Sequence, residues 1–243
     1  MEESVFTEMK TTTSSQFRSG LKAGTSIAIG YFPIAIAFGL IAKTTDLTLF
    51  QTMLMSFIVF AGAAQYMSLS LIAEGIGMAE IVLTTFIVNI RHLLMSASLN
   101  EKVEEDKPVK KAIYAFGITD ETFSVASLQK GTVTTGFMFG LTLISFTSWV
   151  LSSGLGFVGG ALLPGFLQES MSIALYAMFV GLLVPSLKGN RKVLYLACVA
   201  ALFNTVLTLS EVVSSGWAIV ISTLVSAVLI EWVVYLRGGA QND

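Results

Sequence analysis

The sequence contains few charged residues and few of the residues that bind metals. Only 12% of its 243 residues are charged, and 54% are hydrophobic with 21 glycines in addition. The apolar residues and glycine together make up roughly 63%, whereas a soluble domain has about 45–50% on that count and about 25% charged residues. A soluble enzyme would need a more charged surface, and a disordered chain would need lower hydrophobicity. One histidine, His92, and one cysteine, Cys198, exclude a multi-histidine metal site and an internal disulfide. We therefore expect an integral membrane protein without a metal centre.

Signatures of catalysis and of nucleic-acid binding are also missing. The sequence has no His-Glu-x-x-His, Gly-x-Ser-x-Gly, Walker or dinucleotide-binding motif, so neither nucleotide hydrolysis nor a cofactor is predicted. The net charge of −2 comes without a basic patch, which speaks against a nucleic-acid partner. The sequence does not favour an enzyme.

Long, continuous apolar segments dominate the chain. A transmembrane helix needs about 20 mostly apolar residues. The segments are Gly20–Ala42, Phe50–Ala73, Met78–Leu99, Lys111–Leu128, Val133–Gly156, Ser170–Leu187, Val193–Leu209 and Ser215–Leu236. They predict an all-α integral membrane protein with about six to eight transmembrane helices in the lipid bilayer of the cell membrane. Residues 1–19 are polar and lack a signal-peptide pattern, so we expect a cytoplasmic N-terminal tail followed by one helical transport domain over residues 20–243.

Basic residues near the segment ends limit the number of crossings. Four groups occur, at Lys10–Lys22, Lys102–Lys111, Lys188–Lys192 and Arg237, and all of them favour the cytoplasmic side. Eight full crossings would place the second group outside. We therefore expect the second and sixth segments to be broken or re-entrant, because FAGAAQ and FVGLLVPS interrupt them with residues that weaken a helix.

The two parts of the chain share a pattern. Gly20–Leu99 and Val133–Leu209 each contain a glycine-containing segment, an interrupted segment and a segment with one asparagine. With six crossings they would run in opposite directions, as in the inverted repeats of transporters, whose interrupted helices flank the substrate site. The alternative is eight plain spans that break the charge rule, with a likeness due to composition alone.

Polar residues within the third segment are the first candidates for a site. In TTFIVNIRHLLMSAS, Asn89 and His92 share a helical face. Asn89 can donate to and accept from an amino-acid head group, and His92 can carry a proton near neutral pH. Arg91 can clamp a carboxylate. The alternative for the polar residues is that they form hydrogen bonds between helices. The alternative for Arg91 is that its side chain snorkels, placing the charged group at the membrane surface.

Further candidates lie in three other segments. Asp120 and Glu121 are adjacent in the fourth segment and point about 100° apart on a helix. A buried carboxylate can carry a proton or hold an ammonium group, unless this stretch is a solvated surface helix. Gly62 and Gln65 lie in the interrupted second segment and Asn204 in the seventh, where the alternative is close helix packing.

The motifs that carry these residues resemble a known family. They are GYFPIAIAFGLIA, SFIVFAGAAQYMSL, VNIRHLLMSASL, FGITDETFSVAS and, more weakly, ALYAMFVGLLVPSLKGNRK. On them the chain resembles the AzlC family of branched-chain amino acid exporters. The resemblance implies a permease that exports leucine, isoleucine, valine or analogues together with a small AzlD-type membrane subunit. It highlights Gly62, Gln65, Asn89, Arg91, His92, Asp120 and Glu121.

We therefore predict a secondary transporter with a site near the bilayer midplane. The predicted substrate-binding residues are Gly62, Gln65, Asn89, Arg91, Asp120 and Asn204, and the predicted proton-coupling residues are His92, Asp120 and Glu121. An apolar pocket for the aliphatic side chain is expected near Phe57, Phe60 and Tyr66. A channel and a non-transporting scaffold or sensor subunit are the alternatives.

Overall fold

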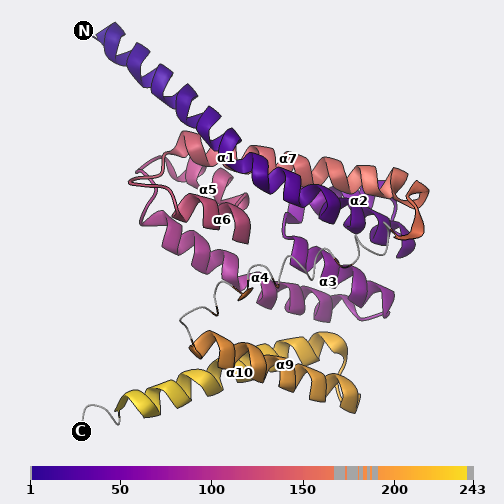
Figure 1. The fold of residues 1–243 in the computed structure, drawn as a ribbon. Helices are drawn as coiled ribbons and strands as arrows, with labels where there is room; N and C mark the ends of the chain where they lie inside the picture. The colour runs from indigo at the N-terminus through magenta and orange to yellow at the C-terminus, as the bar shows by residue number, and fades with distance from the viewer. Residues whose placement is uncertain are drawn as a thin grey trace. The chain divides into compact units, whose positions relative to one another are not determined.

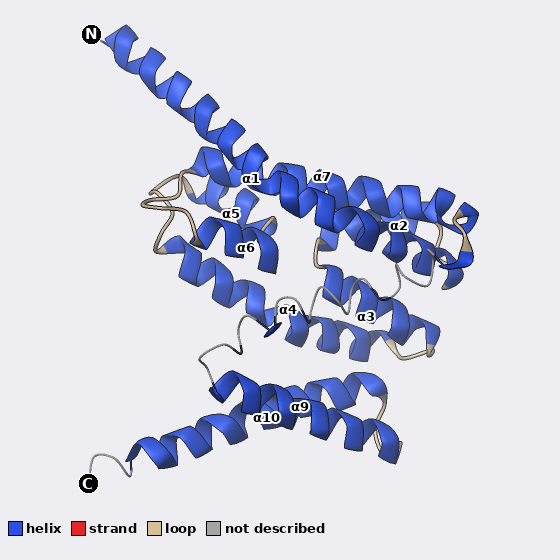
Figure 2. Ribbon diagram, in the orientation of Figure 1, coloured by secondary structure: helices blue, strands red, loops and turns tan. Residues whose placement is uncertain are grey.

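The computed structural model describes residues 2–166, residues 191–239, and residues 173, 180, 183, 184 and 187 between them. Across these residues the regular elements are helices, without a β-sheet (Figure 2). The predicted sixth segment and its break at Phe179–Ser186 lie almost wholly outside the described residues. The prediction of an all-α protein is confirmed.

The helices follow the predicted segments, except that the second and the fourth segment each form two short helices. They are α1 (Glu2–Thr44), α2 (Leu49–Val59), α3 (Gly62–Ala73), α4 (Met78–Asn100), α5 (Pro108–Phe116), α6 (Asp120–Ser127), α7 (Thr135–Gly159), η1 (Gly160–Leu162), α9 (Arg191–Ser210) and α10 (Ser215–Gly239). Among the described residues, five helices are long and apolar enough to cross a membrane: α1 from Ser14 onward, α4, α7, α9 and α10. They correspond to the first, third, fifth, seventh and eighth predicted segments. The polar residues before Gly20 continue α1 rather than form a separate element.

The chain divides into two compact units, and each is described by itself. The first comprises Met1–Leu69 and Val88–Ala174, and the second comprises Ser70–Ile87 and Leu175–Asp243. The first unit contains α1, α2, α5, α6 and α7 with parts of α3 and α4, and almost all of the predicted site.

Helices α1 and α7 form the axis of the first unit. They pack with their backbones in contact: a Cβ atom on Gly20 would lie 2.1 Å from the backbone oxygen of Phe137, and one on Gly39 would lie 2.0 Å from that of Ser153. Only glycine permits such an approach. Because the residue numbers rise together along the contact, α1 and α7 run in the same direction (Figure 1).

This parallel packing overturns one expectation. The sequence predicts that the first and fifth segments run in opposite directions. The prediction of an inverted repeat that starts at those two segments is therefore wrong. The physical reason lies in the fourth segment, which does not span the unit but folds back on itself, so that α7 starts from the end of the unit where α4 stops.

The second segment is a hairpin of two short helices, α2 and α3. Helix α2 ends at Phe60, whose backbone is left-handed with a φ angle of 38°. Ser56 on α2 donates a hydrogen bond to Ser153 of α7 at 2.9 Å, and Gln65 on α3 donates to Ser56 at 3.1 Å. The chain therefore turns back at Phe60 and Ala61, and Gln65 and Ser56 join the two arms near this tip. The predicted interruption within FAGAAQ is confirmed.

The fourth segment is a second hairpin, formed by α5 and α6. The backbone N–H of Val133 donates to the carbonyl of Lys102 at 2.9 Å, and that of Glu104 donates to the carbonyl of Val133 at 2.9 Å. The chain thus leaves at the end of α4 and returns to the same place before α7 begins. With nine and eight residues, neither arm is long enough to cross a bilayer core of about 30 Å. The expected crossing by Lys111–Leu128 is therefore wrong.

Local sequence explains why this segment folds back. Helix α5 ends at Gly117, and Thr119 starts α6 with a capping box, in which its side chain accepts from the N–H of Thr122 and the Thr122 side chain accepts from the N–H of Thr119. An N-cap of this kind contributes about 1 kcal/mol to the helix that it starts, so the Thr119 capping box stabilises a new helix at this position.

The tips of the two hairpins meet in the middle of the first unit. The rings of Phe60 and Phe116 lie 6.4 Å apart, and both pack against Phe146 of α7, at 5.2 and 5.9 Å. One hairpin enters from the end where α1 stops and the other from the end where α4 stops. The basic residues Arg18 and Lys22, beside the start of α7, share an end of the unit with Lys102. That this end faces the cytoplasm stays a prediction.

The second unit pairs α9 with α10 and attaches them to the start of α4. Lys192 and Glu231 form an ion pair at 2.5 Å between the two helices. The carboxylate of Glu80 accepts a hydrogen bond from the backbone N–H of Trp217 at 3.2 Å and another from the Ser214 hydroxyl. A carboxylate at the N-terminus of a helix is favourable because the helix dipole is positive there.

Candidate functional site

An ion pair between α4 and α6 brings two of the predicted residues together. The Nη1 atom of Arg91 lies 2.7 Å from Oδ2 of Asp120, with the side chains 34% and 22% exposed. Asp120 is the first residue of α6, directly after the Thr119 cap, so the tip of the α5–α6 hairpin fixes its position. Arg91 therefore contacts protein through its guanidinium group, and it does so at the level of a hairpin tip.

Glu121, the next residue, is held by a tyrosine that sequence reasoning missed. The hydroxyl of Tyr31 on α1 donates to Oε2 of Glu121 at 2.6 Å and lies 2.7 Å from the hydroxyl of Thr119. The Tyr31 ring packs edge-on against Trp149 at 5.2 Å. The sequence offered one signal: a tyrosine inside an apolar helix needs a partner for its hydroxyl group.

Three of the predicted residues each have a polar atom without a hydrogen-bond partner among the described residues. These atoms are Oδ1 of Asn89, Nε of Arg91 and Oε1 of Glu121, all of them buried. Buried polar groups are paired in the great majority of cases, and an unpaired one costs about 1–3 kcal/mol. Three predicted residues thus present one donor and two acceptors that a ligand can satisfy.

His92 lies next to Arg91 on α4 and is partly buried. Of the predicted proton-coupling residues, Asp120 pairs with Arg91, Glu121 follows Asp120 on α6, and His92 follows Arg91 on α4. Their role in coupling stays a prediction.

Gln65 and Gly62 lie at the tip of the other hairpin. The Gln65 side chain is 0% exposed; it donates to Ser56 at 3.1 Å and accepts from the indole N–H of Trp149 at 2.9 Å. A Cβ atom on Gly62 would lie 2.7 Å from the Trp149 ring. Both residues hold the α2–α3 tip against α7. Direct contact between either residue and a substrate stays a prediction.

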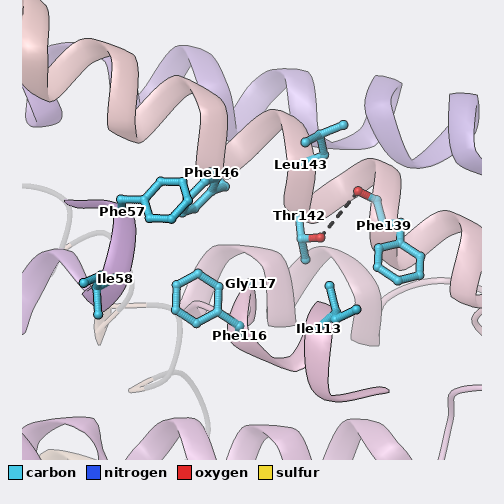
Figure 3. A pocket seen from close by; sticks show the side chains of 9 residues that line it. All are labelled: Phe57, Ile58, Ile113, Phe116, Gly117, Phe139, Thr142, Leu143 and Phe146. Carbon is cyan, nitrogen blue, oxygen red and sulfur yellow. Dashed lines mark hydrogen bonds between the residues drawn. The ribbon is translucent and has the colours of Figure 1, made fainter. Parts of the chain in front are cut away.

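An apolar pocket opens beside the two tips. It has a volume of about 470 Å³, within the range of about 300–1,000 Å³ found for ligand pockets. Figure 3 shows the residues that line it: Phe57, Ile58, Ile113, Phe116, Gly117, Phe139, Thr142, Leu143 and Phe146. The Thr142 hydroxyl is satisfied by the carbonyl of Met138 at 2.8 Å, so the pocket offers almost only carbon to an occupant.

The predicted apolar lining is found in part. Phe57 lines the pocket, and the Phe60 ring packs on two of the pocket phenylalanines. Tyr66 instead donates its hydroxyl to the carbonyl of Ile34 at 2.6 Å and is buried. Gly117 lines the pocket and lies three residues before Asp120 in the sequence. The α5–α6 hairpin therefore contributes both to the pocket and to the ion pair.

Asn204, the remaining predicted residue, belongs to the second unit. It lies on α9, and its Oδ1 atom is buried without a hydrogen-bond partner in the part of the chain that the structure describes. Its place in a substrate site stays a prediction.

Comparison with known proteins identifies the family. A family model described as "AzlC protein" matches residues 26–163. The chain belongs to the AzlC family. The matched residues run from α1 to the end of η1 and thus include both hairpins and the Arg91–Asp120 ion pair.

Several individual proteins are also similar to this chain. A membrane protein of Archaeoglobus fulgidus is 32% identical over 73% of this chain and 79% of its own length. The inner membrane protein YgaZ of Escherichia coli is 30% identical over 77% of this chain and 78% of its own length. A Bacillus subtilis relative, named branched-chain amino acid transport protein AzlC, is 26% identical over 72% and 70%. No solved structure matches the chain.

Proposed function

We propose that this protein is the large subunit of a secondary transporter that exports branched-chain amino acids across the cell membrane. The observation that carries the proposal is the Arg91–Asp120 ion pair at a hairpin tip, in which the Nε atom of Arg91 is buried without a partner among the described residues. The name of the B. subtilis relative supports the substrate class. An ionisable residue inside a membrane domain is expensive and usually functional.

The chemistry of the site suits a zwitterion with an aliphatic side chain. Arg91 can bind the carboxylate, because guanidinium groups bind carboxylates bidentately. Asp120 and Glu121 can bind the ammonium group, and Asn89 can add a hydrogen bond. The pocket lined by Phe57, Phe116 and other apolar residues can take the side chain. One methylene changes the affinity of an apolar pocket by only about 1–3 kcal/mol, so we expect overlapping use of valine, leucine and isoleucine.

Two further parts of the proposal concern coupling and assembly. Export is coupled to protons, with His92, Asp120 and Glu121 as the carriers, and the pairing of Asp120 with Arg91 supports a role for that carboxylate. A small AzlD-type membrane subunit assembles with the chain. Within the described residues, the apolar stretches of α4 and α9 are only 6% and 0% buried, which leaves these faces for lipid or for such a subunit.

An efflux experiment tests the proposal. Cells that lack their own exporters are loaded with leucine or valine as dipeptides, and internal and external amino acids are followed with the chain alone, with an AzlD-type partner, and with neither. We expect faster export with both proteins, and slower export when the pH gradient is collapsed. Flux that fails to saturate with substrate would favour a channel. Unchanged efflux in every condition, with the protein shown in the membrane, would contradict the proposal.

A further inference from the structure

The guanidinium of Arg91 is only partly used in this structure. It has five N–H donors, and its ion pair with Asp120 joins a single nitrogen, Nη1, to a single oxygen, Oδ2. Its Nε atom is buried without a partner among the described residues. An arginine that binds a carboxylate permanently more often uses two parallel hydrogen bonds. Arg91 therefore keeps capacity for a second, better-matched carboxylate.

The acidic side of the ion pair is also incomplete. Glu121 uses Oε2 to accept from Tyr31, while its Oε1 atom is buried without a partner in the described part of the chain. Asp120 pairs with Arg91, and the next residue, Glu121, keeps one free acceptor. A group with several N–H donors, such as an ammonium ion, would pair with Asp120.

We propose that the Arg91–Asp120 ion pair takes the place of the substrate zwitterion in the empty protein and is exchanged for it when an amino acid binds. This inference rests on the proposed function and deepens it. The substrate carboxylate replaces Asp120 on Arg91, using Nε and an Nη atom, and the substrate ammonium group replaces Arg91 on Asp120. No bond other than hydrogen bonds and ion pairs forms or breaks.

Charge balance is the physical basis of this exchange. Removing one partner from a partly buried ion pair is costly, because the other charge is left without compensation. A zwitterion supplies both replacements at once and adds no net charge. A simple anion or cation would satisfy one residue and leave the other unpaired, so the pair would select against ligands that carry only one of the two charged groups.

The exchange would also link binding to movement. Arg91 belongs to α4, and Asp120 is the first residue of α6, so the ion pair ties α4 to the tip of the α5–α6 hairpin. A bound amino acid between the two side chains would separate them. The empty protein holds the tip against α4, and the loaded protein releases it.

Binding of three related ligands tests the exchange. They are leucine, 4-methylpentanoate, which lacks the ammonium group, and 3-methylbutylamine, which lacks the carboxylate. Each is titrated by calorimetry into purified full-length wild type, Arg91→Gln and Asp120→Asn. We expect wild type to bind leucine at least about 10-fold more tightly than either analogue, and each variant to bind leucine about 10- to 100-fold more weakly, as expected for the loss of a hydrogen bond to a charged group.

The variants should also reverse the preference among the analogues. Asp120→Asn frees Arg91 and should gain affinity for 4-methylpentanoate, whereas Arg91→Gln frees Asp120 and should gain affinity for 3-methylbutylamine. A gain of binding cannot come from misfolding. Lys192→Gln, which removes the exposed ion pair with Glu231, is the matched control and should leave all three affinities unchanged.

The charge-swapped double variant, Arg91→Asp with Asp120→Arg, separates binding from mere stabilisation. If the pair only holds α4 to α6, the swapped pair should restore leucine affinity, and that result would overturn the exchange. We expect a folded protein that still binds leucine weakly, because Asn89 and Glu121 keep their places. Wild-type leucine affinity in both single variants would also overturn the exchange while leaving the proposed function intact. Failure of wild type to bind any branched-chain amino acid would contradict both.

Discussion

The hydrogen bonds of Gln65 allow a quantitative test of what holds the α2–α3 hairpin. The side chain accepts from Trp149 at 2.9 Å and donates to Ser56 at 3.1 Å, and it is fully buried. Gln65→Leu keeps a similar volume but removes both hydrogen bonds. It leaves the indole N–H of Trp149 without an acceptor, whereas Ser56 keeps its bond to Ser153.

The expected cost follows from that geometry. One buried donor left unpaired costs about 1–3 kcal/mol, so Gln65→Leu should lower the free energy of unfolding by this amount. Trp149→Phe removes the indole N–H and leaves the Gln65 oxygen unpaired. When both partners are apolar, neither is left unpaired. The double variant should therefore lose less than the sum of the single losses, by about 0.6–1.7 kcal/mol, the range found for hydrogen bonds between membrane helices.

The assay is a double-mutant cycle on the purified protein in detergent, with unfolding followed by circular dichroism in increasing denaturant. A control cycle combines Gln65→Leu with Trp232→Phe, since the Trp232 side chain is 60% exposed, and these two changes should be additive. Additive losses for Gln65 and Trp149 would refute the reasoning, because they would mean that the hydrogen bond contributes nothing to the hairpin.

Two further predictions concern helix packing and pH. Gly39→Ala should lower the unfolding temperature at a cost of about 1–3 kcal/mol, because its Cβ atom would lie 2.0 Å from the backbone oxygen of Ser153. Gly30→Ala on the same helix, where no atom lies within 4 Å, should not lower it, and equal losses would contradict the packing. In the loop after α4, hydrogen bonding from Lys110 lowers the pKa of Asp106 from its ordinary 3.8 to about 2. The stabilisation by Asp106 is therefore present above about pH 4 and lost as the pH falls through about 2, so wild type should unfold at a higher temperature than Asp106→Asn at pH 5, and the difference should vanish toward pH 2. A difference that is the same at both pH values would contradict the shifted pKa.

The sequence was sufficient for features that depend on neighbouring residues. Five apolar runs are long helices, and the break at Phe60–Gln65 follows from small residues in an otherwise apolar stretch. The spacing of Asn89 and His92 on one face of α4 also follows from the sequence, and their place in a substrate site stays a prediction. These features are local, and the period of the helix is enough to derive them.

Features that depend on distant residues could not be derived. The parallel packing of α1 and α7 depends on Gly39 meeting the backbone near Ser153, and nothing in either helix specifies its partner. Tyr31 could be assigned to the site only from its hydrogen bond to Glu121, which the sequence does not show. The return of the fourth segment had a local signal at Gly117 and Thr119, but counting charges and hydrophobic residues does not detect a capping box.

The parallel α1–α7 pair has a consequence for how the protein is made. The Ser148 hydroxyl donates to the carbonyl of Ala28 at 2.7 Å, across 120 positions of the chain. A ribosome adds residues in order. The glycine surface of α1 therefore stays without its partner helix in the lipid until both hairpins and α7 have been synthesised. The buried Gln65 and its partner Trp149 are likewise separated by 84 positions. The first unit is therefore completed late in synthesis. A chain released before α7 would contain both hairpins but lack the helix against which they and α1 pack.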